Sequence, residues 1–220
     1  MLSIVIPTLN AAATLPATLA CLGEMPDAQR IVVDGGSTDG TVACARALGA
    51  EVITAPRGRG GQLVAGARAA RGAWLLFLHA DTVLDPGWRR PVDAALAGDP
   101  DRVGYFRFAL DDADPAARRL ERRVAWRCRV LGLPYGDQGL LISRRCYDAV
   151  GGFRPLPLME DVDLVRRLGR ARLAAFDHAA VTAATRYRRA GYRRRSARNL
   201  VCLSLYFLGL PPRVLVWLYR

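Results

Sequence analysis

Short apolar runs alternate along the chain with segments in which apolar residues recur at helical spacing. Continuous runs of about four to eight apolar residues are typical of strands that helices cover on both faces, as in a parallel sheet. This alternation predicts an α/β domain with a mostly parallel central sheet flanked by helices. The strands are expected at Leu2–Ile6, Arg30–Asp34, Glu51–Ala55, Trp74–Leu78, Val103–Leu110 and Leu140–Ser143, and the longest helix at Pro115–Leu131.

The sharpest change of polarity follows the strand predicted at Trp74–Leu78. Five apolar residues lead directly into His79, Ala80 and Asp81. In open α/β sheets, ligands collect beyond the carboxyl ends of the strands. His79 and Asp81 are therefore candidates for holding a metal ion or a phosphate, and the alternative is a core strand that ends in a turn.

Two glycine-containing loops follow other predicted strands. Asp34 stands at a strand tip before Gly-Gly-Ser-Thr-Asp-Gly, where its carboxylate faces the expected cleft and could accept hydrogen bonds from a base or a ribose. Residues 56–62, PRGRGGQ, open a helix, and free backbone N–H groups at a helix start bind anions. Arg57 and Arg59 add charge suited to phosphate oxygens, although the sequence is not a P-loop because it lacks GK[ST].

A second acidic stretch begins a helix near Glu160. Helical spacing places Asp161 on the face of Leu164, Val165 and Leu168, and Glu160 on a more polar side. Asp161 is thus expected to face apolar surroundings at the mouth of a loop, which suits a general base. The alternative is that these carboxylates only compensate the helix dipole.

Composition bears on the partners and the compartment. The formal net charge is +12, and all 32 basic residues are arginines, so part of the charge is compositional background. Net positive charge favours anionic partners such as nucleotides, phospholipid surfaces or nucleic acid. The five cysteines form no close pair, which argues against a structural zinc site or disulfides and favours a reducing, cytoplasmic compartment. The first residues do not resemble a signal peptide.

Together these motifs resemble the family 2 glycosyltransferases, which have the GT-A fold. The resemblance covers about residues 2–173 and rests on SIVIPTLN, IVVDGGSTDGT, the acidic motif after LLFLHAD, and VGGF…MEDVDLVRR. PRGRGGQ, FLHADT and GDQG also look like a short bacterial subgroup associated with arsenosugar biosynthesis. The resemblance implies an inverting transfer of a sugar from a nucleotide-diphosphate donor to an acceptor hydroxyl. The acceptor and the oligomeric state are not specified.

The resemblance also assigns roles to individual residues. Asp161 would be the catalytic base, and the residues that bind the nucleotide sugar would be Pro7, Thr8, Asp34, Arg59 and Asp81. Asp81 would be the metal-binding carboxylate of the family's DxD motif, whose first Asp is His79 here. Since imidazole suits Mn²⁺ better than Mg²⁺, the expected cofactor is Mn²⁺, with Asp81 and His79 as ligands. The loop residues expected to bind the acceptor are Asp137, Gln138 and Glu160.

The last part of the chain differs in character from the first. We expect a glycosyltransferase domain over residues 1–185 and a tail over 186–220 that is first basic and then apolar. Neither apolar run of the tail approaches the ~20 residues that span a bilayer. The tail is expected to be a helix packed on the domain, and a peripheral contact with the inner face of the plasma membrane is the alternative.

Two other functions compete with glycosyl transfer. Charge and the Arg/Tyr tail permit nucleic-acid binding, but no nucleic-acid motif is present and acidic residues gather at the strand tips, so no nucleic-acid partner is expected. A sugar-phosphate nucleotidyltransferase would use a similar nucleotide site, and it would release pyrophosphate in place of a nucleoside diphosphate.

Overall fold

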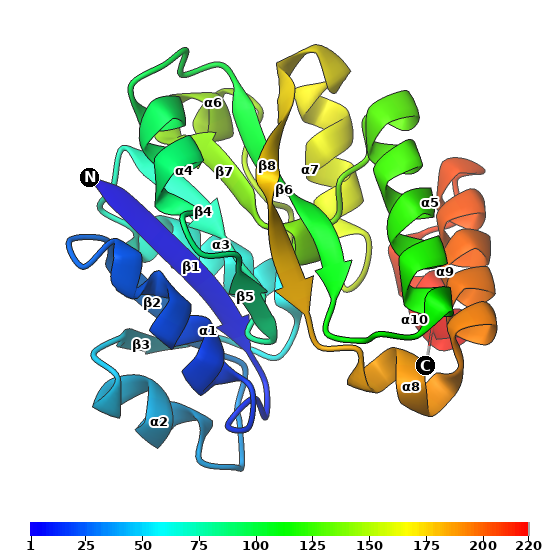
Figure 1. Ribbon diagram of the computed structural model, residues 1–220, viewed down its shortest axis with the longest axis horizontal. Coiled ribbons are helices and arrows are strands. Elements are labelled where there is room, and N and C mark those ends of the chain that lie inside the picture. Colours follow the sequence, from blue (N-terminus) through cyan, green and yellow to red (C-terminus); the bar gives the residue numbers. More distant parts are fainter. Residues whose placement is uncertain (220) are drawn as a thin grey trace.

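The computed structural model describes residues 1–219 and confirms the expected α/β architecture (Figure 1). One sheet holds the strands in the order β3-β2-β1-β4-β7-β6-β8-β5. The strands are β1 (Leu2–Thr8), β2 (Gln29–Asp34), β3 (Glu51–Thr54), β4 (Trp74–Phe77), β5 (Thr82–Leu84), β6 (Val103–Leu110), β7 (Leu140–Ser143) and β8 (Leu173–Thr182).

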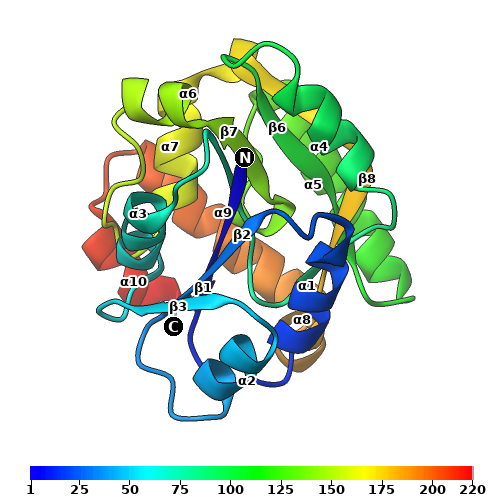
Figure 2. The same cartoon turned by 90° about the vertical axis from the view of Figure 1, so that its left-hand side faces the viewer.

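Helices cover both faces of this sheet. The α-helices are α1 (Leu15–Cys21), α2 (Thr41–Ala47), α3 (Arg59–Ala69), α4 (Arg89–Leu96), α5 (Pro115–Leu131), α6 (Arg144–Ala149), α7 (Glu160–Leu168), α8 (Thr185–Ala190), α9 (Tyr192–Phe207) and α10 (Pro212–Tyr219). Three 3-10 turns are η1 (Leu22–Glu24), η2 (Gly136–Gln138) and η3 (Arg170–Arg172). Figure 2 shows α3, α6 and α7 on one side of the sheet and α1 and α4 on the other.

The core explains why the first strands read as unbroken apolar runs. In β1, Val5 packs with α3 residues on one face of the sheet, whereas Ile4 and Ile6 pack with α1 on the other. All three side chains are fully buried. Because β1, β2, β3 and β4 are parallel neighbours, their carboxyl ends meet at one edge. This edge carries the loops that the sequence singled out.

Two strands were not predicted. β8 pairs in parallel with β6, and β5 pairs antiparallel with β8 through Thr82 and Thr182. β8 is rich in alanine, which has low strand propensity, so only its pairing with β6 makes it a strand. Its end brings residues 182 and 183 next to the segment that follows β4, where Ala183 N–H donates to the carbonyl of Asp81 at 3.0 Å.

The C-terminal helices pack onto the rest of the protein at the end of the sheet away from α1 and α2 (Figure 1). A separate apolar cluster joins Cys202, Leu203 and Leu215 of α9 and α10 to Val162 and Val165 of α7. No helix within residues 1–219 is both long enough and apolar enough to cross a bilayer. The five cysteines are all free thiols.

Candidate functional site

A pocket of about 100 Å³ lies where the segment after β4 meets α3, α7 and the C-terminal helices. Five side chains selected from the sequence line this pocket together: Arg59, His79, Asp81, Asp137 and Asp161. The lining residues discussed below are Arg59, His79, Asp81, Tyr135, Asp137, Asp161, Arg186, Tyr187, Arg195, Asn199 and Tyr219. The carboxylates, the imidazole and several guanidinium groups therefore share one small polar space.

A buried ion pair forms one side of this pocket. Arg59 is the first residue of α3, and its guanidinium Nε donates to the Glu160 carboxylate at the start of α7. The Glu160 side chain is 1% exposed, whereas that of Asp161 is 14% exposed. The predicted faces of α7 were therefore wrong: Glu160 is the more buried carboxylate, because Arg59 neutralises it. Burial raises the pKa of Glu160, and the charge of Arg59, which acts to lower the pKa, does not offset the rise.

Asp161 keeps a defined orientation beside this pair. Its Oδ2 accepts the Gly136 N–H at 2.9 Å and lies 4.0 Å from the Arg59 guanidinium, and its Oδ1 accepts the Val162 N–H at 2.8 Å. A Cβ on Gly136 would lie 2.9 Å from the Nε2 of His79 and 3.5 Å from the Oδ2 of Asp161. The glycine thus lets the η2 backbone approach both groups.

His79 and Asp81 are the candidate metal ligands. The Nε2 of His79 lies 3.4 Å from Arg59 Nη1, and burial, Arg59 and Arg186 together hold the pKa of the imidazole well below its usual value. Within residues 1–219, no group of three or more His, Cys, Asp or Glu side chains could hold a metal ion. Asp81 alone fits a cation that also binds substrate phosphates, since hard divalent ions often use one or two carboxylates plus phosphate oxygens. His79 fits this role less well because its Nε2 faces the guanidinium group of Arg59.

Of the three residues predicted to bind the acceptor, Glu160 is buried in its ion pair with Arg59 and does not line the pocket. The other two, Asp137 and Gln138, lie in different environments. Asp137 lines the pocket, and its Oδ1 is buried with no hydrogen-bond partner among residues 1–219. Burial raises the pKa of Asp137 to about 6, opposed by Arg127 and assisted by Asp161. Gln138 is instead buried in η2, where its side-chain amide donates to the Phe106 carbonyl at 3.1 Å. Gln138 therefore holds the loop in shape and does not line the pocket.

Of the residues predicted to bind the nucleotide sugar, Arg59 and Asp81 line this pocket, whereas Pro7, Thr8 and Asp34 lie outside it. Thr8 and Asp34 are paired neighbours at the carboxyl ends of β1 and β2, and Pro7 precedes Thr8. Asp34 is 3% exposed, and its Oδ2 accepts the N–H groups of residues 36 and 37 at 2.9 Å each. Burial opposes the ionisation of Asp34, but hydrogen bonds from Ser37, residue 36 and Thr8 outweigh it and lower the pKa. Asp34 thus stays an acceptor, although the expected orientation toward the cleft is not seen, since the carboxylate is bound to its own loop.

The sequence pattern did not predict that the C-terminal helices α8, α9 and α10 form one wall of the pocket. Arg195 of α9 lies with its guanidinium carbon 5.1 Å from the centre of the Tyr187 ring, and its Nη2 donates to the Tyr219 hydroxyl at 3.5 Å. Burial raises the pKa of Tyr187 to about 12. The Arg/Tyr-rich run was visible in the sequence, but nothing in it showed that α8 and α9 turn back over the pocket.

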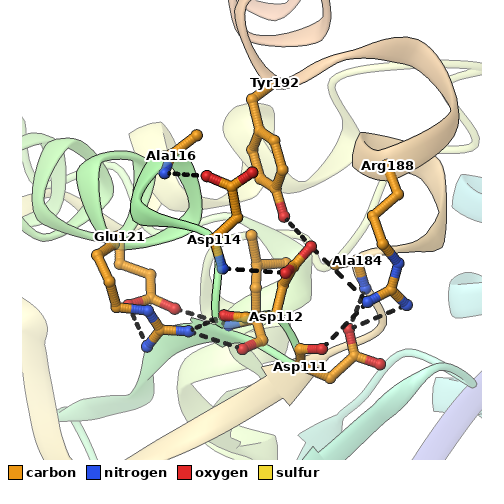
Figure 3. Close-up of polar contacts among 10 residues, drawn as sticks. Asp111, Asp112, Asp114, Ala116, Glu121, Ala184, Arg188 and Tyr192 are labelled. Carbon is orange, nitrogen blue, oxygen red and sulfur yellow. Dashed lines mark hydrogen bonds and ion pairs between the residues drawn. The ribbon is translucent and has the colours of Figure 1, made fainter.

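An acidic loop after β6 holds these helices in place (Figure 3). The Tyr192 hydroxyl at the start of α9 donates to Asp112 at 2.7 Å, and Arg188 of α8 pairs with Asp111 and Asp112 at 3.7 Å each. The hydrogen bond from Tyr192 lowers the pKa of Asp112. These contacts fix the helices that carry Arg186 and Arg195.

Comparisons with known proteins find glycosyltransferases. The family model described as glycosyl transferase family 2 matches residues 3–156. A PGL/p-HBAD biosynthesis glycosyltransferase of Mycobacterium bovis is 42% identical over 93 residues, which are 38% of this chain and 36% of that protein. An uncharacterized glycosyltransferase of Mycobacterium tuberculosis is 39% identical over 87 residues, which are 39% of this chain and 38% of that protein. The match thus spans little more than a third of these curated relatives. They do not support the arsenosugar subgroup.

Solved structures show the same fold. Glucosyl-3-phosphoglycerate synthase from Mycobacterium tuberculosis, in complex with Mn²⁺, UDP and glucosyl-3-phosphoglycerate, superposes with a TM-score of 0.59 at 24% identity. The match covers 83% of this chain and 70% of that one. A complex of the same enzyme with Mn²⁺, UDP-glucose and phosphoglyceric acid gives a TM-score of 0.58, also at 24% identity, over 80% of this chain and 68% of that one. At this identity the likeness shows the fold, which confirms the expected GT-A architecture.

Proposed function

The chain belongs to glycosyl transferase family 2, and on that premise we propose that it transfers a sugar from a nucleotide-diphosphate donor to an acceptor hydroxyl. The observation that supports this most is the meeting of Arg59, Asp81 and Asp161 in one pocket. Such a displacement requires a guanidinium group for the phosphate, a carboxylate that can hold a metal ion, and a base for the acceptor hydroxyl.

In the proposed reaction, Asp161 removes the proton from the acceptor hydroxyl. Its two hydrogen bonds from backbone N–H groups hold the carboxylate in one orientation while leaving lone pairs for the acceptor. Arg59, fixed by Glu160, holds a phosphate oxygen of the donor. A divalent cation bound at Asp81, such as the Mn²⁺ present in the complex of the structurally similar synthase, would neutralise charge on the departing diphosphate. Attack from the face opposite the leaving group inverts the anomeric carbon.

The size of the pocket bears on how the donor lies. Pockets for small ligands commonly hold ~300–1,000 Å³, so a space of about 100 Å³ encloses only the reacting end of a nucleotide sugar. We place the nucleotide beyond it, along the carboxyl ends of β1 and β2 at Pro7, Thr8 and Asp34. UDP is the first nucleotide to test, since the structurally similar synthase was solved with UDP and with UDP-glucose.

A binding and transfer experiment tests this function. UDP-, GDP- and dTDP-sugars are screened by thermal shift with and without Mn²⁺, and the nucleoside diphosphate released with acceptor mixtures is measured for the best donor. A ligand at 100 times its Kd raises the unfolding free energy by about 2.7 kcal/mol. Asp161→Asn should lower transfer about 10²–10⁴-fold with little change in donor binding. Full activity in that variant would remove Asp161 from the role of base, and release of pyrophosphate would identify a nucleotidyltransferase.

We also propose that the C-terminal helices lie on an anionic phospholipid surface, at the inner face of the plasma membrane. A groove of about 760 Å³ between α5, α7 and α9 is lined by apolar side chains and by Arg166 and Arg170. Phe207 and Leu208 at its edge are 46% and 78% exposed. Apolar side chains bordered by arginines match the interface of a membrane that contains acidic lipids.

Vesicle flotation tests this surface. The protein should float with vesicles of phosphatidylglycerol and phosphatidylcholine and much less with phosphatidylcholine alone. The double variant Phe207→Ser, Leu208→Ser should lose the binding, whereas Leu48→Ser, which alters an exposed leucine after α2, should keep it. Equal flotation of both variants would refute the proposal, and a wild-type dimer that the double variant cannot form would assign the groove to a second copy of the chain.

The arsenosugar role is a narrower proposal. It is supported by the motifs PRGRGGQ, FLHADT and GDQG alone. Transfer to an arsenic-containing acceptor, compared with the arsenic-free analogue, would test it.

A further inference from the structure

Three polar atoms with no hydrogen-bond partner lie at the pocket. They are Asp137 Oδ1, Arg195 Nε and Asn199 Oδ1, and each is buried without a partner within residues 1–219. Buried polar atoms in folded proteins are nearly always paired, because an unpaired one costs free energy comparable to a lost hydrogen bond. Unpaired atoms on neighbouring sides of one pocket are therefore available to pair with a polar ligand or with ordered water.

The charge of this wall indicates what kind of ligand it is. Arg186 and Arg195 line the pocket, and neither forms an ion pair with a carboxylate in the described part of the chain. Arg59, in contrast, has a protein counter-ion in Glu160. The wall made by α8 and α9 thus offers positive charge without a protein counter-ion, together with an amide oxygen that accepts from a hydroxyl.

The position of the wall separates it from the nucleotide. Thr8 and Asp34 end β1 and β2, which lie toward one edge of the sheet, whereas α8 and α9 follow β8 near the other edge. Figure 1 shows β2 and α8 on opposite sides of the molecule. The acidic loop that binds Tyr192 and Arg188 fixes α8 and α9 (Figure 3). The stacking of Arg195 on Tyr187 further fixes its guanidinium.

We propose that Arg186, Arg195 and Asn199 form an acceptor subsite for a small hydroxylated compound that carries a phosphate or carboxylate group. The anion binds the two guanidinium groups, and a hydroxyl of the same molecule donates to Asn199. A neighbouring hydroxyl then lies at Asp161. This inference rests on the proposed glycosyl transfer and names the class of acceptor.

The binding experiment uses glycerol 3-phosphate as a probe, with glycerate as the carboxylate arm and glycerol as the uncharged arm. Calorimetric titrations are run on the wild type with and without saturating UDP. Glycerol 3-phosphate should bind, glycerol should not, and UDP should leave the probe's Kd within about threefold. Competition between UDP and the probe would instead place the anion in the phosphate site of the donor and overturn the proposal, as would equal binding of glycerol or no binding of either anion.

Variants locate the probe. Arg195→Gln should weaken glycerol 3-phosphate at least tenfold, and so should Asn199→Asp, which keeps the size of the side chain and adds a repelling charge. Arg194→Gln, on the exposed side of the same helix, is the matched control and should bind as the wild type does. Unchanged affinity in both pocket variants would refute the subsite. If the donor fails to bind but the anion binds at Arg195, only the proposed transfer fails, and if the donor binds and the anion does not, only this subsite fails.

Discussion

The titration of Asp137 gives the sharpest quantitative test of the site. The carboxyl group is buried in the pocket near Asp161 and Asp81, and these surroundings raise its pKa from an ordinary 3.8 to about 6. Between these two values the folded protein holds a proton that the unfolded chain has lost. Unfolding free energy therefore falls as pH rises through this window. At 1.36 kcal/mol per pKa unit, the fall attributable to Asp137 is at most about 3 kcal/mol.

Asp137→Asn removes this titration. At pH 4 the variant and the wild type should have nearly equal stability, because both carry a neutral side chain there. Above pH 7 the variant should be the more stable by about 1–3 kcal/mol, since a neutral amide replaces a carboxylate that is costly to ionise. Urea unfolding in the presence of a chelator, at intervals from pH 4 to 8, measures the difference. Asp27→Asn, at an exposed position, controls for the loss of one carboxylate.

Coincident pH profiles for the wild type and Asp137→Asn would refute the reasoning. The same result would show that Asp137 is better solvated or better paired than the geometry indicates. A variant that is more stable at every pH by a constant amount would mean that the substitution acts through packing and not through ionisation.

Three further predictions concern residues of η2, α3 and α7 near the pocket. Gly136→Ala places a methyl group 2.9 Å from the ring of His79 and should reduce transfer more than tenfold while shifting the Tm by only a few degrees, as activity and thermal unfolding assays would show. Gly60→Ala meets backbone oxygens at 2.5 and 2.8 Å and should cost about 1–3 kcal/mol of stability, whereas Gly61→Ala, with open space around it, should be neutral or slightly stabilising in urea unfolding. Glu160→Gln removes the charge from the buried ion pair and should cost about 1.5–3 kcal/mol in the same assay, and equal stability would show that the pair is dispensable.

The sequence predicts the nucleotide-side half of the fold well, for a physical reason. β1, β2 and β4 are buried on both faces, so their apolar runs are unbroken, and the positions where polarity returns mark the edge that carries the site. β8 is different. Its alanines, with an aspartate and a histidine, have no strand pattern, and its pairing partner β6 lies some 70 residues earlier, which local periodicity does not reveal.

The site shows the same division between local and long-range information. The candidate roles of Arg59, Asp81 and Asp161 follow from motifs, and the structure places all three side chains in one pocket. Which of Glu160 and Asp161 is buried depends on the position of Arg59, about a hundred residues earlier. Helical spacing alone cannot supply that position, and it therefore assigned the wrong carboxylate to the polar side.

The location of Tyr219 has a consequence for the order in which the protein matures. This side chain, at the end of α10, touches the same space as residues from α3 and from the segment after β4. During translation the chain leaves the ribosome from its N-terminus, so β1 to β8 emerge before α10. The side of the pocket that Tyr219 lines forms only after α10 has emerged. A nascent chain that already binds a nucleotide would therefore still lack the complete pocket in which the sugar is transferred.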